Sequence, residues 1–100
     1  AAEYSLLYMK DMYNEAIKAS NGKKVIITET GWPSKGSDLW GAHPSYTNYL
    51  KYFINAQLWS KDQGIDMFYF SSFDESWKVE AEGDVGAYWG LWDKDEVIKF

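Results

Sequence analysis

The sequence contains no cysteine, and only two of its 100 residues are proline. Without cysteine, the chain has neither a disulfide framework nor a thiolate metal site. No hydrophobic run approaches the roughly 20 residues that a membrane-spanning helix needs, and no segment has the pattern of a signal peptide. We therefore expect no membrane partner. Cysteine-free proteins occur inside and outside cells, so these absences do not fix a compartment.

Positive charge is also scarce. Ten basic residues stand against 15 acidic ones, which gives a net charge of −5, and the basic residues form no cluster. Phosphate binding needs a positive face, so we expect no nucleic-acid partner. Aromatic residues, in contrast, are abundant: six Trp, eight Tyr and five Phe make up 19% of the chain. Such a content suits a dense core or a surface that stacks on flat ligands such as sugar rings.

The first half of the chain predicts a helix followed by a strand. Apolar residues recur at steps of three and four from Tyr4 to Ala19, which is typical of an amphipathic helix, and Gly22 can end it. Residues 23–28 then form the predicted strand. Its unbroken run Val25-Ile26-Ile27 indicates burial on both faces, as in a parallel sheet.

The second half repeats this order. A polar loop over about residues 34–44 leads to a second helix at about 45–60, which Gly64 closes. Residues 65–73 are the predicted second strand, and residues 74–78 are its exit loop. Beyond an acidic segment, residues 88–92 and 97–100 are either short strands or extended pieces. No further well-formed helix is legible.

Two strands joined by a helix make one parallel βαβ unit. Two strands do not make a stable sheet with two covered faces, so this chain alone should leave a broad apolar surface open. We therefore predict an α/β fold in which residues 1–100 form a single partial domain, incomplete on its own and part of a larger α/β body.

Two glutamates lie where the predicted strands end. Glu29 precedes the turn Gly31-Trp32-Pro33, and Glu75 follows the second strand 46 residues later. The carboxyl ends of parallel strands share one rim of a sheet, where chemistry is usually done. Hydrolysis of a glycosidic bond needs two carboxyl groups, which a retaining enzyme holds about 5 to 5.5 Å apart. Alternatively, both are solvated charges or loop anchors. Lys78 could pair with Glu75 and keep it ionised, which would make Glu75 a substrate-binding group.

The tryptophans allow the same two interpretations. Trp32, Trp40 and Trp77 lie in loops beside the carboxylates, where either sugar stacking or structural packing is credible. Trp59 lies within the second helix and is predicted to be core or interface. His43 has no partner pattern, and we expect it to be structural or solvated.

Four motifs in order resemble those of glycoside hydrolase family 17, the β-1,3-glucanases and glucanosyltransferases. The first, Ile27-Thr28-Glu29-Thr30-Gly31-Trp32-Pro33-Ser34, is similar to the family's nucleophile motif. The others resemble the loop before the seventh helix, the eighth-strand motif and the closing segment: Gly41-Ala42-His43-Pro44-Ser45, Phe73-Asp74-Glu75-Ser76-Trp77-Lys78 and Trp89-Gly90-Leu91-Trp92-Asp93.

The resemblance implies a (β/α)8 TIM barrel with retaining chemistry, of which this chain would be the C-terminal portion, about strands seven and eight with their preceding helices. Glu29 would be the nucleophile. Glu75 and Lys78 would line the donor-side sugar site, and Trp32 and Trp77 would bound the groove. The proton donor would lie on the fourth strand, in the N-terminal remainder of the barrel. No cofactor and no metal are implied.

Two departures bear on the subtype. Ser76 stands where many microbial relatives have proline, and Gly86 stands where plant members usually have glutamate. The second departure favours a fungal-type enzyme.

The leading hypothesis is therefore a retaining glycosidase or transglycosylase acting on β-1,3-glucan, secreted or in the cell wall. Its partners would be a β-glucan oligosaccharide or polysaccharide and the barrel remainder, and the 100-residue chain alone should be inactive. The alternative is a non-catalytic carbohydrate-binding module that uses the loop tryptophans. A third possibility is a structural half-barrel whose function lies in a partner chain.

Overall fold

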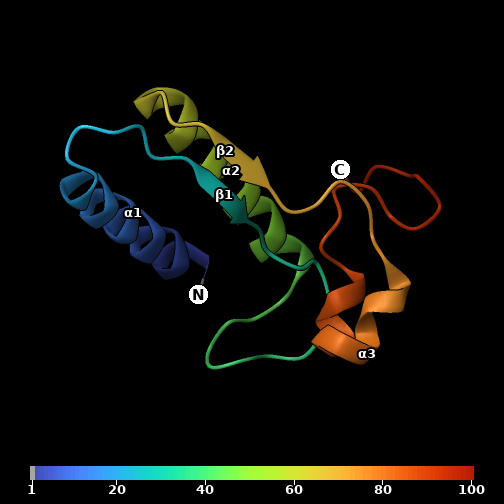
Figure 1. Cartoon of the computed structure of the whole chain (residues 1–100). Coiled ribbons are helices and arrows are strands. Elements are labelled where there is room, and N and C mark those ends of the chain that lie inside the picture. The colour runs from blue at the N-terminus through green and yellow to red at the C-terminus, as the bar shows by residue number, and fades with distance from the viewer. Residues whose placement is uncertain (1) are drawn as a thin grey trace.

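The computed structural model describes residues 2–100 and confirms the helix–strand–helix–strand order. Figure 1 shows these elements followed by a loop-rich region that lies beyond the ends of the strands. The elements are α1 (Ala2–Ala19), β1 (Ile27–Thr30), α2 (Tyr46–Gln63), β2 (Met67–Tyr69), the 3-10 turn η1 (Ser76–Lys78), α3 (Val79–Glu82) and the 3-10 turn η2 (Asp84–Ala87). Among residues 2–100, no helix combines the length and the hydropathy of a membrane span.

Helix α2 is capped at both ends. At its start, the hydroxyl of Ser45 accepts a hydrogen bond from the backbone N–H of Asn48 at 3.0 Å. This contact satisfies one of the free N–H groups of the first turn. At its end, Gly64 adopts the left-handed conformation, with φ +64°, and its N–H bonds to Lys61 and Ser60 carbonyls. Because glycine takes this conformation without steric cost, the helix ends there.

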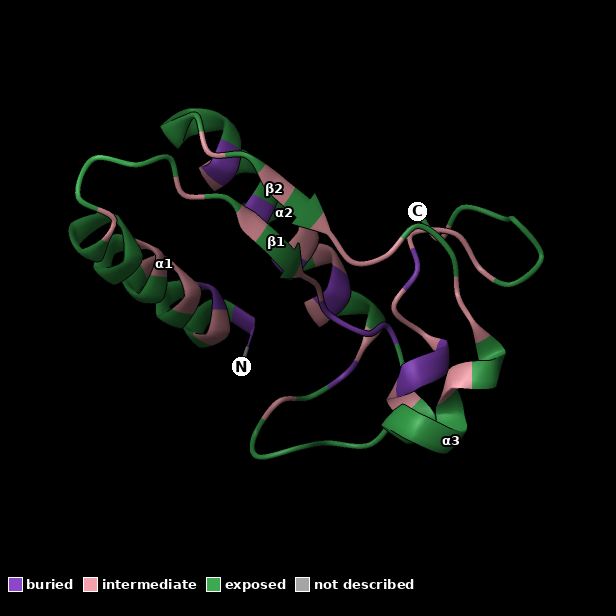
Figure 2. Cartoon of the chain, in the orientation of Figure 1, coloured by how far each residue is buried: buried purple, intermediate pink, exposed green. Residues whose placement is uncertain are grey.

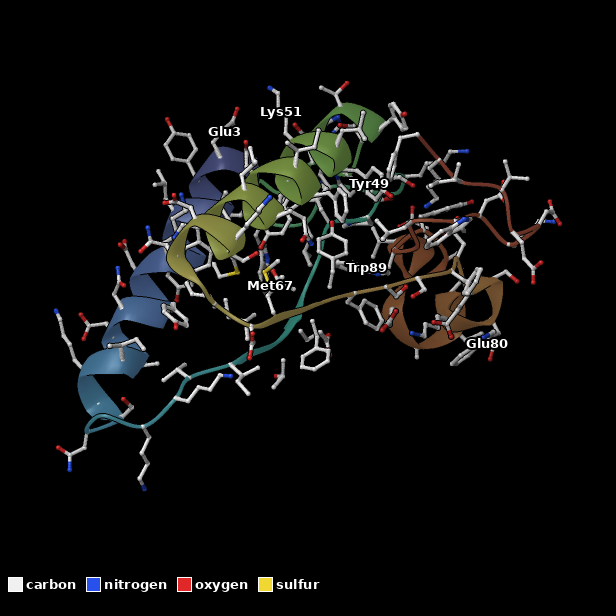
Figure 3. All side chains as sticks on the ribbon, turned by 90° about the horizontal axis from the view of Figure 1, so that it is seen from above. Glu3, Tyr49, Lys51, Met67, Glu80 and Trp89 are labelled. Carbon is white, nitrogen blue, oxygen red and sulfur yellow. The ribbon has the colours of Figure 1, made fainter. Side chains whose placement is uncertain are left out.

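The two strands pair in parallel, and both helices lie on the same side of them. Helix α2 packs on the sheet and α1 packs beside α2, where Glu3 of α1 and Lys51 of α2 form an ion pair of 3.5 Å. Figure 3 shows both residues above the two strands, with Met67 between the sheet and α2. The buried core is small and aromatic, and Figure 2 places most of it in α2 and the stretch after β1. Its members are Ala2, Leu6, Trp32, Tyr49, Tyr52 and Ala56.

The opposite face of the sheet is open. Phe68, the middle residue of β2, is 64% exposed, and Ile26 is also exposed. The prediction that the Val25-Ile26-Ile27 run is buried on both faces is therefore wrong for this chain, because the helices cover one face only. The broad apolar surface that the sequence predicted is confirmed.

The strands are shorter than predicted, and β1 is shifted towards its exit. Residues 23–26, expected to be strand, precede β1, and the first bond across the sheet runs from the Ile27 N–H to the Asp66 carbonyl at 3.0 Å. A strand needs a partner along its length, and β2 covers only residues 67–69. Glu29 therefore lies inside β1, near its end.

Residues 71–100, which we call the C-terminal half although they are fewer than the residues before them, combine extended segments with the short elements η1, α3 and η2. The stretch 71–74 bonds to 89–92, for example from the Asp74 N–H to the Trp92 carbonyl at 2.9 Å. The stretch 89–92 in turn pairs with residues near the end, through an antiparallel bridge between Trp92 and Ile98. This arrangement confirms the expectation of extended pieces. The short helix α3, four residues long, was not predicted.

Candidate active site

Glu29 lies in an irregularity of the sheet. Ile27 pairs with Met67 and Thr30 pairs with Tyr69, so β1 uses one more residue than β2 between the same two rungs. Thr28 and Glu29 together therefore face Phe68 across the strands. A bulge of this kind bends a strand and redirects a side chain, and such irregularities are frequent next to active sites.

The bulge directs Glu29 away from the helices. Thr30, the next residue, faces them: its hydroxyl lies 2.5 Å from the Tyr52 hydroxyl of α2. Tyr69, its partner on β2, packs edge-on against Phe53 of α2. Glu29 instead stands opposite the exposed Phe68, and it is itself exposed. The carboxylate is therefore available to a ligand on the open side of the sheet.

Glu75 and Lys78 form an ion pair just beyond β2. The Lys78 ammonium lies 3.1 Å from a carboxylate oxygen of Glu75, and the two side chains are 16% and 33% exposed. This confirms the predicted pairing. The turn η1 produces it, because the Lys78 N–H bonds to the Glu75 carbonyl at 3.0 Å and brings the two side chains together. Both groups are half-buried, so their charges are screened less than those of a surface pair.

Lys78 also connects this pair to the end of β1. Its ammonium lies 4.4 Å from the centre of the Phe70 ring, a cation–π distance. Phe70 follows β2, and its N–H bonds to the carbonyl of Thr30 at 2.8 Å. At the same place, a side chain on Gly31 would collide with the Phe70 carbonyl, so only glycine permits this close approach. Glu29, one residue before Thr30, and the Glu75–Lys78 pair thus belong to the same rim of the sheet.

The three loop tryptophans have different surroundings. Trp32 is only 6% exposed, packs on Tyr52, and its indole N–H donates to the His43 carbonyl at 3.2 Å. A ring so enclosed has no free face for a sugar, so the prediction that Trp32 bounds the groove is revised: it supports the loop after Glu29. Trp77 is 70% exposed, next to Lys78, and offers a free face. Trp40 is exposed at a turn farther along the loop.

The structure agrees with the interpretations of Trp59 and His43. Trp59 of α2 packs edge-on against Tyr13 of α1 at 5.6 Å, which confirms an interface role. His43 is exposed and its ring contacts Asp38 at 2.5 Å, a local loop contact.

Sequence reasoning missed a buried ion pair beside Glu75. The Lys99 ammonium lies 2.7 Å from Asp74, and the two side chains are 12% and 9% exposed. Lys99 also lies 5.3 Å from the centre of the Tyr49 ring. Burial, helped by the negative charge of Asp74, raises the pKa of Tyr49 to about 12. No periodic pattern links positions 74 and 99. The one available signal was an acidic residue within the motif that also contains Glu75 and Lys78.

The rim can bind and orient a neutral, hydroxyl-rich ligand. It combines an exposed carboxylate on a bulged strand, a second carboxylate held by a lysine, and an exposed indole ring. Carboxylates and ammonium groups bond to sugar hydroxyls, and an indole face stacks on sugar rings. Among residues 2–100, no three His, Asp or Glu side chains are grouped so that they could hold a metal ion.

Comparison with protein families gives a match over nearly the whole chain. The family model described as "BtgE/BtgC glycoside hydrolase domain" matches residues 1–90. A glucan 1,3-beta-glucosidase of Arthroderma benhamiae is 38% identical over 93 residues, which cover 85% of this chain and 30% of that protein. The probable family 17 glucosidase SCW4 of Saccharomyces cerevisiae is 42% identical over 74 residues, 73% of this chain and 18% of that protein.

A solved structure is similar over the full length of the chain. The crystal structure of a glycoside hydrolase family 17 beta-1,3-glucanosyltransferase from Rhizomucor miehei superposes with a TM-score of 0.85 at 35% identity. The match covers 99% of this chain and 34% of that one. The chain thus spans about a third, or less, of the length of these relatives.

Proposed function

Because the chain belongs to the family of the BtgE/BtgC glycoside hydrolase domain, within glycoside hydrolase family 17, we propose that it forms part of a retaining enzyme that cleaves or transfers β-1,3-glucan. The single observation that carries this proposal is the shared rim: an exposed Glu29 near the end of a bulged strand, and the Glu75–Lys78 pair beyond the end of the neighbouring strand. The relatives named glucan 1,3-beta-glucosidase and beta-1,3-glucanosyltransferase support the substrate class.

In this proposal Glu29 is the nucleophile. One oxygen of its carboxylate forms a bond to the anomeric carbon while the glycosidic C–O bond breaks. The leaving oxygen takes a proton from a second carboxyl group, which the remainder of the barrel supplies. Water or a sugar hydroxyl then attacks the anomeric carbon and releases Glu29, returning a proton to that second group.

Glu75 and Lys78 bind the substrate rather than transfer protons. The ion pair of 3.1 Å with Lys78 holds the Glu75 carboxylate in place, and its oxygens can accept hydrogen bonds from sugar hydroxyls. Trp77 forms a wall of the groove, since its ring is exposed beside Lys78. Trp32 contributes only indirectly, by holding the loop that follows Glu29.

We also propose that the remainder of the molecule completes a (β/α)8 barrel, in which β1 and β2 are strands seven and eight. The open face of the sheet and its exposed Phe68 support this proposal, as does the match to about a third of a family 17 enzyme. In this barrel the open face becomes the interior. A secreted or cell-wall location belongs to the same proposal, since glucan is found there.

Replacement of Glu29 by Gln in the full-length enzyme tests the nucleophile. The amide cannot form the glycosyl-enzyme, so turnover of a laminarin-type glucan should fall by a factor of about 10⁴ or more while glucan binding is retained. Glu15→Gln is the matched control, because Glu15 is an exposed glutamate of α1 that contacts only Lys18. It should leave turnover unchanged.

A mechanism-based fluorosugar provides a second test. In the wild-type enzyme, mass spectrometry should find the sugar attached to the peptide that contains Glu29. An adduct on another carboxylate would remove Glu29 from the mechanism. A wild-type protein that binds glucan without any adduct or turnover would favour a non-catalytic binding module.

A further inference from the structure

The proposed chemistry leaves one buried polar cluster without a role. Lys99 donates hydrogen bonds to three acceptors: Asp74 at 2.7 Å, the Ser34 hydroxyl at 3.0 Å and the Tyr88 carbonyl at 3.3 Å. An ammonium group has three N–H bonds, so these three acceptors satisfy it fully. The Asp74 oxygen that faces Lys99 also accepts the Gly90 N–H at 2.9 Å. We call this group of contacts the Lys99 clasp.

The clasp joins the two loops that follow β1 and β2. Ser34 lies in the loop after β1, five residues beyond Glu29, and is buried. Asp74 lies in the loop after β2, directly before Glu75. Lys99 comes from a third segment, and its backbone N–H bonds to the Leu91 carbonyl at 3.1 Å. One ammonium group therefore connects both loops of the rim.

Glu75 depends on its neighbours for its position. It starts the turn η1, and its side chain makes no capping hydrogen bond there. On one side it is held by the ion pair with Lys78, and on the other its backbone continues into Asp74. Because Asp74 is bound by Lys99 and by the Gly90 N–H, the clasp holds the backbone from which the Glu75 side chain projects.

The clasp is also built to be rigid. Its ion pair is almost fully buried, and charge-assisted hydrogen bonds in such surroundings are short and directional. The Lys99 ammonium lies over the ring of Tyr49, which is itself completely buried in the core. Figure 3 shows Tyr49 pointing from α2 towards the C-terminal half. The clasp thus connects the rim to the hydrophobic core.

We propose that Lys99 is a positioning residue for glycosyl transfer, which acts by holding Asp74 and Ser34 so that Glu75 is presented to the sugar in a fixed orientation. This inference rests on the proposed function. Lys99 itself does not contact the substrate.

Replacement of Lys99 by Met in the full-length enzyme is the first measurement. Methionine retains the length of the side chain and removes all three donors. The value of kcat/KM for a laminarin-type glucan should fall about tenfold, mainly through a higher KM, because Glu75 contributes to substrate binding. Lys94→Met is the matched control: Lys94 lies in the same segment, is exposed and forms an ion pair with the exposed Asp95. It should behave as the wild type.

A double-mutant cycle with Glu75→Gln separates positioning from a general structural role. If Lys99 acts through Glu75, then adding Lys99→Met to the Glu75→Gln enzyme should lower kcat/KM by less than about twofold. If the two losses multiply instead, so that Lys99→Met again costs about tenfold, the positioning role is overturned. Asp74→Asn repeats the cycle with a neutral group of the same shape, in case Lys99→Met does not fold.

The wild-type measurement distinguishes the two levels of the proposal. A wild-type enzyme without turnover of β-1,3-glucan refutes the proposed function and this inference with it. An active wild type in which the losses multiply refutes the inference alone. An active wild type with non-multiplying losses, in either variant pair, supports both.

Discussion

The molecule has two parts of unequal length, which are stabilised by different interactions: the helix–sheet half, residues 2–70, and the shorter C-terminal half, residues 71–100. In the first half, apolar side chains of α1 and α2 pack together and on the sheet, and the core consists of Leu6, Tyr49, Tyr52 and their neighbours. In the second half, buried apolar side chains are few, and backbone hydrogen bonds and the Lys99 clasp hold the extended segments. The site lies where the two halves meet. Glu29 belongs to the first and Glu75 to the second.

Because of this difference, the two halves hold their residues in place with different precision. Apolar packing is non-directional and sets a general arrangement, while hydrogen bonds and close backbone contacts fix positions more sharply. The half that carries Glu75 and Lys78 therefore depends on direct contacts at a few points. Replacing single residues in each half should expose this difference.

The largest effect is expected in the C-terminal half, from Gly90→Ala. A side chain at this position would overlap the Asp74 nitrogen, the Phe73 carbonyl carbon and the Trp92 oxygen, all of which are backbone atoms. The segments would have to separate, so we expect a loss of about 4 kcal/mol or more in the free energy of unfolding of the full-length protein, measured in urea.

Gly41→Ala is the matched control for this change. Gly41 has φ +83° and no atom within 4 Å of the added carbon, so only the backbone conformation is penalised. That penalty is about 1 kcal/mol. Equal losses in the two variants would contradict the view that close backbone contact holds the C-terminal half.

A smaller effect is expected in the helix–sheet half, from Ser45→Ala. The variant loses the hydrogen bond from the Asn48 N–H that caps α2. The cost should be about 1 kcal/mol in the free energy of unfolding, because the packing of α2 remains. Thr47→Ala, an exposed change in the same first turn, should cost less. A loss as large as that of Gly90→Ala would mean that both halves depend equally on single contacts.

The smallest effects should come from pH. Hydrogen bonds from Ser37 lower the pKa of Asp84, and those from the Val97 and Asp95 N–H groups lower that of Asp93. A lowered pKa in the folded state means that the stabilisation is complete above the unfolded pKa of about 3.9 and is lost as the pH falls below it. In α1, a backbone hydrogen bond and the charge of Lys51 lower the pKa of Glu3 in the same way. Because two such carboxyls lie in the C-terminal half, Asp84 and Asp93, we expect that half to loosen first in acid.

In alkali the helix–sheet half should respond most. Burial raises the pKa of Tyr49 to about 12 and also raises that of Tyr52. The stabilisation from a neutral tyrosine is complete below the unfolded pKa of about 10 and is lost as the pH rises towards the folded value. Hydrogen exchange of separate segments across the pH range measures both responses. Loosening of both halves together in acid would contradict this division.

The two halves also differ in how far the sequence predicted them. Three- and four-residue periodicity placed α1 and α2, and the order of elements predicted the parallel pairing, because these patterns are local. The sequence did not predict where the strands begin and end, because β1 forms only where β2 provides a hydrogen-bonding partner. Trp32 was expected beside the ligand because it lies in a loop, but packing on Tyr52 encloses it.

For the site, the strand exits and the family motifs indicated Glu29, Glu75 and Lys78, and the spacing of three residues predicted the ion pair that the structure contains. The contact of Lys99 with Asp74 joins positions 25 residues apart without any repeating pattern. Such contacts follow from the path of the chain in three dimensions, so they become visible only in the structure.

The two-stranded sheet has a consequence for assembly. Within residues 2–100, β1 and β2 pair only with each other, so the outer flank of each strand carries amide and carbonyl groups without a neighbour in the sheet. In the barrel that we propose, the remaining polypeptide must offer a strand to each flank, both running in the same direction as β1 and β2. If the full-length protein is expressed as two polypeptides divided before α1, the two should therefore assemble by strand pairing. A proline on the outer flank of β1 or β2 should prevent this assembly.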